Sequence, residues 1–207
     1  MTSDRIGRAL EQFLQAMISY RSKADLALNS FDNNPIDPSL VLDAQELRGL
    51  DIFKGAAGIS CELCHELQAA TNVWQANNGL DLVPPDPGTT VPALQRNGTH
   101  GIFRAASLRN IALTGPYMHD GRFATLSEVI DHYDHGIVAS SDLDAILKDT
   151  TGAPRQMNLS DSDKAALEAF LNTFTDAAML ADPKFANPFR SEGPITLSPA
   201  DGTGRSL

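Results

Sequence analysis

The sequence of 207 residues predicts an all-α fold with long loops, and three observations support this prediction. Apolar residues recur at intervals of three and four in four separate segments, as they do on the buried face of a helix. No segment shows a strand pattern strong enough to predict a sheet. The connecting segments are rich in Gly, Pro, Asn and Asp, which favour turns.

The first predicted helix covers about residues 4–26, and the turn-rich residues 29–38 end it. Its apolar positions are Ile6, Leu10, Phe13, Leu14, Met17 and Ile18. The second predicted helix covers residues 43–53 and ends at Gly55. Its apolar side consists of Leu47, Leu50 and Phe53.

Two more helices are predicted in the second half of the chain. One begins at Thr125, where Thr-Leu-Ser-Glu fits a capping box, and stops at Gly136. Its apolar stripe is Leu126, Val129, Ile130 and Tyr133. The other begins near Ser160 and carries Leu167, Phe170, Leu171 and Phe174.

Residues 77–100 predict a long ordered loop of the kind that can wrap a cofactor. We expect one domain over residues 1–182, with the first helix as an N-terminal linker. Residues 183–207 are rich in Pro and Gly and are expected to form a surface tail.

The net charge of −10 makes nucleic acid an unsuitable partner, because a phosphate backbone is bound by excess Lys and Arg. A basic or dipolar protein partner suits this charge better. No apolar run approaches the roughly 18 residues of a membrane span. The first five residues lack the pattern of a signal peptide.

The most specific motif is Cys61-Glu62-Leu63-Cys64-His65. Two thiols three positions apart reach the two vinyl groups of a haem, and the following imidazole is then held beneath the iron. The motif predicts one haem c per chain, with thioethers from Cys61 and Cys64 and with His65 as an axial ligand. A structural zinc site usually needs more thiolates than the two cysteines of this chain. Bacteria attach haem to this motif outside the cytoplasm, so we expect a periplasmic protein whose export signal is not part of this chain.

The second axial ligand has several candidates. Met118, in the turn of residues 115–121, is of the residue type that commonly pairs with His in cytochromes c, although it could also only pack against the haem edge. Tyr133 belongs to the buried stripe of its helix, where either a ligand or a core tyrosine would stand. The remaining histidines are candidates too, although such residues are more often at the surface or hydrogen-bonded: His100, His119, His132 and His135.

Residues 103–121 (FRAASLRNIALTGPYMHDG) and 167–176 (LEAFLNTFTD) resemble the second haem domain of bacterial di-haem cytochrome c peroxidases and MauG-type enzymes. The likeness extends from the first helix to about Asp182. It implies a cytochrome c-like fold in which His65 binds the relay haem. In this family the other ligand is Met in the simple peroxidases and Tyr in the MauG-type enzymes, and the matching position is Tyr133, which we therefore prefer to Met118.

The resemblance also implies a calcium ion held by backbone carbonyls of a segment that matches Thr114 and Pro116. Carbonyl oxygens suit such a hard cation. The alternative is that these two residues only shape a turn.

By resemblance, the chain is the electron-transfer half of a peroxidase-type oxidoreductase. It would take electrons from a small cytochrome or cupredoxin and relay them to a haem that reduces hydrogen peroxide, in an N-terminal domain that this chain lacks. Trp74 does not match the tryptophan that bridges the two haems in the family, and Ile59 stands where MauG-type enzymes have a surface tryptophan. The alternative is a free-standing mono-haem electron carrier.

Overall fold

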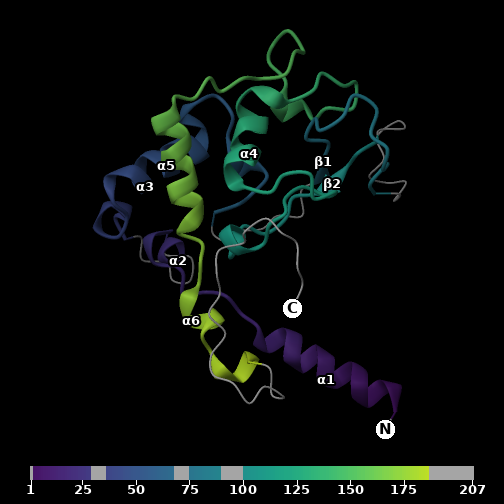
Figure 1. The fold of residues 1–207 in the computed structure, drawn as a ribbon, viewed down its shortest axis with the longest axis vertical. Coiled ribbons are helices and arrows are strands. Elements are labelled where there is room, and N and C mark those ends of the chain that lie inside the picture. The colour runs from purple at the N-terminus through teal and green to yellow at the C-terminus, as the bar shows by residue number, and fades with distance from the viewer. Residues whose placement is uncertain (1, 29–35, 68–74, 90–99, 187–207) are drawn as a thin grey trace.

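The computed structural model describes residues 2–28, 36–67, 75–89 and 100–186, and helices are the main regular structure of this part of the chain (Figure 1). Its α-helices are α1 (Ser3–Ala16), α2 (Lys23–Leu28), α3 (Ala44–Asp51), α4 (Leu126–Asp131), α5 (Asp161–Asn172) and α6 (Ala177–Leu180). Two short strands, β1 (Gln75–Ala76) and β2 (Phe103–Arg104), pair antiparallel. None of the described helices combines the length and apolar character of a membrane span.

Two helices continue into π-helical turns. The turn Ile52–Ala56 follows α3 and contains a kink at Gly55, which has a φ of 111°. The turn His132–Gly136 follows α4. Shorter 3-10 turns occur at Pro38–Leu40, Cys61–Leu63, Ile111–Leu113, Ala145–Leu147 and Pro183–Phe185.

Three of the predicted helices are confirmed, together with the residues that begin them. Asp43 and Thr125 each form a capping box with the glutamate three residues later. Ser160 accepts a hydrogen bond from the Asp163 backbone N–H and thereby caps α5. The two short strands were not predicted from the sequence.

The prediction of one helix over residues 4–26 is wrong. The chain forms α1 and α2 with an extended segment between them, because the buried carboxylate of Asp176 accepts hydrogen bonds from the backbone N–H groups of Tyr20 and Arg21 at 2.9 and 3.0 Å. A helix through Tyr20 and Arg21 would use these N–H groups internally. The apolar side chains of α1 are exposed, and Leu14 shows 63% of its surface to solvent.

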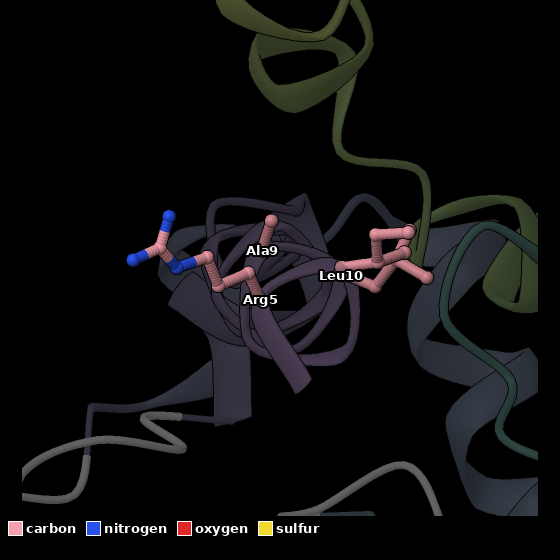
Figure 2. A pocket seen from close by; sticks show the side chains of 4 residues that line it. Arg5, Ala9 and Leu10 are labelled. Carbon is pink, nitrogen blue, oxygen red and sulfur yellow. The ribbon is translucent and has the colours of Figure 1, made fainter. Parts of the chain in front are cut away.

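α1 lies apart from the other helices at the lower edge of the molecule (Figure 1). Phe13 touches the ring of Phe185 edge-on, with ring centroids 6.4 Å apart. A shallow hollow along α1 is lined by Arg5, Ile6, Ala9 and Leu10 (Figure 2). The predicted tail from residue 187 onward lies outside the described residues.

The main core forms where α3 packs against α5. Gly49 of α3 lies so close to α5 that a Cβ there would overlap the carbonyl oxygen of Ala166. Phe53, Phe170 and Phe174 pack edge to face in the centre of this core. Its buried members are Ala24, Ala27, Leu42, Leu50, Ile52, Phe53, Leu67, Leu108, Leu126, Ile130, Leu167, Phe170, Leu171 and Phe174.

A smaller apolar cluster lies beside the main core, and Ala57 and Leu159 pack against both. It consists of Ile59, Ile137, Leu143, Leu147 and Met157, and Tyr133 packs against it. Residues 77–80, which we call the strap, lie along this cluster. The strap is bonded to the chain after α4, because Val138 N–H donates to the Gly79 carbonyl at 2.8 Å.

Candidate functional site

The cysteine segment is a compact turn that follows the main core. Gly55 and Gly58 both have positive φ angles and lead the chain out of the π-helical turn toward Ser60. The backbone N–H groups of Cys64 and His65 then donate to the Cys61 carbonyl at 3.1 and 2.8 Å. This turn presents Cys61, Cys64 and His65 from one short stretch of backbone.

Neither cysteine belongs to a disulfide, and both are half-buried. Burial, with a smaller contribution from Cys64, raises the pKa of Cys61 to about 12. Burial and the nearby Asp144 carboxylate raise the pKa of Cys64 to about 11. Both shifts favour the neutral thiol over the thiolate.

The ring of His65 is oriented by one backbone contact. Its Nδ1 lies 2.9 Å from the carbonyl oxygen of Ala106, which can only accept, so Nδ1 carries the proton and donates. Burial lowers the pKa of His65, which favours the neutral imidazole. In this tautomer Nε2 keeps its lone pair, as an axial iron ligand requires.

Tyr133, on the π-helical turn after α4, turns its hydroxyl toward the cysteines. Burial raises the pKa of Tyr133 to about 12, the Asn78 hydrogen bond opposes this shift, and the two cysteines add to it. The phenol oxygen lies 3.3 Å from Nδ2 of Asn78. The structure thus brings together the CxxCH motif and the tyrosine that the sequence comparison with the family favoured.

Met118 approaches the same place from the turn before α4. Its φ of 72° lies in the left-handed region, which is unusual for a residue with a side chain. Its sulfur lies 3.4 Å from Asn78 Nδ2, the same nitrogen that contacts Tyr133. Both candidate second ligands therefore converge on one amide group.

The other candidate histidines have different partners. The Nε2 of His132 donates to the Asn78 carbonyl at 3.0 Å, and His135 contacts the Asp134 carboxylate at 3.1 Å. His119 stacks on Phe103 with ring centroids 3.8 Å apart. His100 Nδ1 lies 3.9 Å from the Asp142 carboxylate.

Thr114 and Pro116 are both exposed in the turn that precedes Met118. The Thr114 hydroxyl donates to the Ile111 carbonyl at 3.3 Å. Tyr117 N–H, next to Pro116, donates to the Phe123 carbonyl at 2.7 Å. These contacts account for the shape of the turn, and the calcium site stays a prediction.

Sequence reasoning missed Asn78 and Ala106. Asn78 stands in an Asn-Asn-Gly segment that reads as a turn, and nothing in the sequence distinguishes its amide from the neighbouring Asn77. Ala106 acts through its backbone carbonyl, which leaves no trace in the residue type. Only the folded chain shows that these two groups contact the predicted ligands.

The set of donors fits a haem c. It combines two uncharged thiols, an imidazole with its lone pair at Nε2 and a phenol on a separate segment, beside an apolar cluster that an apolar macrocycle could extend. The same set is poor in the charged oxygen ligands that magnesium or calcium prefers.

No protein-family model matches the chain. Among curated proteins, the cytochrome c551 peroxidase of Nitrosomonas europaea is 33% identical over 137 residues, which are 63% of this chain and 37% of that protein. A cytochrome-c peroxidase of Denitromonas iodatirespirans is 29% identical over 69% of this chain and 44% of its own length. The MauG protein of Methylophilus methylotrophus is 26% identical over 86% of this chain and 49% of its own length. The chain therefore spans less than half of the length of these relatives.

Two solved structures share the fold. A MauG-like protein associated with microbial copper homeostasis superposes with a TM-score of 0.62, at 30% identity, over 83% of this chain and 53% of that chain. The di-haem peroxidase BthA from Burkholderia thailandensis has a TM-score of 0.51 at 19% identity, over 81% of this chain and 49% of its own, and supports the fold alone. The curated relatives and the MauG-like structure point to one group, and the chain belongs to the family of di-haem cytochrome c peroxidases and MauG proteins.

Proposed function

We propose that this chain is the electron-transfer haem domain of a di-haem peroxidase or MauG-type enzyme. In this proposal Cys61 and Cys64 bind one haem c in a cytochrome c-like fold, and His65 and Tyr133 are the axial ligands. Two observations support it: Cys61 and Cys64 both act on the Tyr133 phenol, and the His65 ring, which follows Cys64 directly, has its Nδ1 engaged by the Ala106 carbonyl so that Nε2 is available. A bound haem supplies a one-electron couple.

The residues around the site support the electron-transfer half of the enzyme. The Ala106 carbonyl orients the His65 ring, and the Asn78 amide contacts the Tyr133 hydroxyl. The cysteine segment and the π-helical turn after α4 therefore each offer one axial ligand. Two protein ligands leave no coordination position for peroxide. The domain would therefore relay electrons to a second haem in another domain, where peroxide is reduced.

The net charge and the cofactor of such a domain indicate its electron donor and its compartment. A net charge of −10 favours a basic or dipolar electron donor, such as a small cytochrome or a cupredoxin. The attachment of haem c implies the periplasm. Calcium on the carbonyls of Thr114 and Pro116 belongs to the same proposal.

The test is to produce the chain with haem and to measure its intact mass and its peroxide turnover with a reduced cytochrome c as donor. We expect the mass of one covalent haem and little turnover. A chain without covalent haem would refute the binding site, and rapid peroxide reduction would refute the relay role. The protein from its native source distinguishes the alternative: one haem on a chain of this length would make it a mono-haem carrier.

A further inference from the structure

One amide group stands between the two candidate ligands of the second axial position. Nδ2 of Asn78 lies 3.3 Å from the phenol oxygen of Tyr133 and 3.4 Å from the thioether sulfur of Met118. A thioether sulfur can only accept a hydrogen bond, so the NH₂ end of the amide faces it. Because this nitrogen carries two hydrogens, it can donate to both side chains at once.

Asn78 is fixed in this position by its neighbours in the strap. The backbone carbonyl of Asn78 accepts a hydrogen bond from Nε2–H of His132, which directly precedes Tyr133. The Gly79 N–H donates to the Asn77 side chain at 2.8 Å, and Gly79 approaches Ile137 so closely that a Cβ would lie 2.6 Å from it. The backbone at Asn78 is therefore held against the π-helical turn that carries Tyr133, and its side-chain amide extends from this fixed position.

Met118 is held at the same amide from the opposite segment. Its left-handed backbone conformation, which a residue with a side chain rarely adopts, is retained only where the surroundings fix it. The contact between its sulfur and Asn78 is one such restraint. Both side chains are thus kept close to each other and to the same donor.

The two acceptors gain different amounts from this donor. A hydrogen bond to an oxygen that carries negative charge is roughly twice as strong as a neutral one, and thioether sulfur is a weak acceptor. An iron-bound tyrosine oxygen carries more negative charge than a thioether sulfur. The amide therefore stabilises ligation by Tyr133 more than it stabilises ligation by Met118.

We propose that Asn78 is a positioning residue that selects Tyr133 over Met118 as the second axial ligand. This inference rests on the proposed function, because it concerns a haem held by Cys61 and Cys64. Loss of the amide removes about one charge-assisted hydrogen bond, so the ratio of Tyr-ligated to Met-ligated protein is expected to fall about tenfold or more.

The experiment compares the ferric absorption and electron paramagnetic resonance spectra and the reduction potential of haem-loaded variants. Asn78→Leu keeps the side-chain size, and Asn78→Ala removes the amide without adding bulk. We expect both variants to move toward methionine ligation and a higher potential. Asn172→Leu, at an exposed position of α5, is the matched control and should keep the original spectra.

A double variant that also removes Met118 shows whether the shift depends on this methionine. In the Asn78→Leu/Met118→Leu double variant no methionine is available at this position, so the shift toward methionine ligation should disappear. A shift that persists in the double variant would overturn the proposal, and so would an unchanged spectrum in both single variants of Asn78.

Tyr133→Phe separates this inference from the proposed function. Its ferric spectrum should change, whereas that of Tyr117→Phe should not, because the Tyr117 hydroxyl donates to the Ile111 carbonyl at 2.9 Å. An unchanged Tyr133→Phe spectrum would remove Tyr133 as a ligand and both proposals with it. A changed Tyr133→Phe spectrum with unaltered Asn78 variants would refute the selecting role of Asn78 alone.

Discussion

On the side formed by α2, α3 and α5, which we call the helical side, fourteen buried apolar residues of the described chain form one core. The opposite side, with the strap, the π-helical turn after α4 and residues 137–159, we call the site side. Its apolar cluster has five buried members. Polar contacts connect the segments of this side: Leu159 N–H donates to the Asp134 carboxylate at 2.8 Å, and Asp144 N–H donates to the Asn77 carbonyl at 3.0 Å.

The two sides therefore depend on different sources of stability. Burial of apolar surface is the larger source of stability on the helical side, where the ion pair between Asp25 and Arg109 adds a polar contact. A small cluster tied by polar contacts gains less from burial, and such regions often rely on a bound group. We therefore expect the haem, if it binds at Cys61 and Cys64, to stabilise the site side most.

The largest expected effect comes from removing the haem attachment. The double variant Cys61→Ser/Cys64→Ser would be unable to form the two thioether bonds to the proposed haem. Amide hydrogen exchange, followed by mass spectrometry, should become faster by about tenfold or more in residues 137–159. Peptides from α5 should change little, and equal acceleration in α5 would mean that the two sides unfold as one unit.

A smaller effect is expected from Gly49→Ala on the helical side. The new Cβ would overlap the Ala166 carbonyl and approach the Phe170 Cβ to 2.7 Å, so α3 must move away from α5. Such overpacking should lower the free energy of unfolding by about 1–3 kcal/mol, measured by urea denaturation followed by circular dichroism.

Gly7→Ala is the matched control for this substitution. Gly7 lies on α1, and a Cβ there would have nothing within 4 Å. Alanine is also the better helix former, so the control should be neutral or slightly stabilising. If Gly7→Ala and Gly49→Ala cost the same, the contact of α3 with α5 would not be the cause.

The smallest effect concerns the buried carboxylate of Asp176, which accepts hydrogen bonds from the segment between α1 and α2. Burial opposes ionisation of Asp176, but hydrogen bonds from the N–H groups of Met179, Arg21 and Tyr20 outweigh it and lower its pKa below the ordinary value of 3.8. Because the folded pKa is the lower one, this stabilisation is fully present above about pH 4 and is lost as the pH falls through the folded value.

Asp176→Asn should therefore weaken the dependence of stability on acid pH. The free energy of unfolding, from urea denaturation between pH 7 and pH 3, should decrease less steeply in the variant than in the original chain. Glu11→Gln, an exposed carboxylate on α1, serves as the control and should keep the original slope. Equal slopes for Asp176→Asn and the original chain would show that Asp176 does not contribute.

Much of the helical framework could be predicted from sequence, because its signals are local. The residues that begin α3, α4 and α5 satisfy helix N–H groups within one turn, so Asp43, Thr125 and Ser160 could be found by inspection. The end of α1 could not, because it depends on Asp176, which lies more than 150 positions away in the chain.

The candidate site divides in the same way. Cys61, Cys64 and His65 form a local motif with a fixed spacing, which the sequence displays directly. Asn78 and the Ala106 carbonyl reach the site only through the folding of separate segments. The preference for Tyr133 over Met118 came from a resemblance, and the structure adds that both side chains share one hydrogen-bond donor.

The two π-helical turns give the site a particular evolutionary constraint. One precedes the cysteine segment and the other carries Tyr133, and a π-turn holds about one residue more than an α-turn. Deletion of that residue would rotate the following side chains by about 100°, away from their present direction. The length of Ile52–Ala56 and of His132–Gly136 is therefore expected to tolerate change even less than the identity of their exposed residues, because a deletion would redirect the cysteine segment or Tyr133 as a whole.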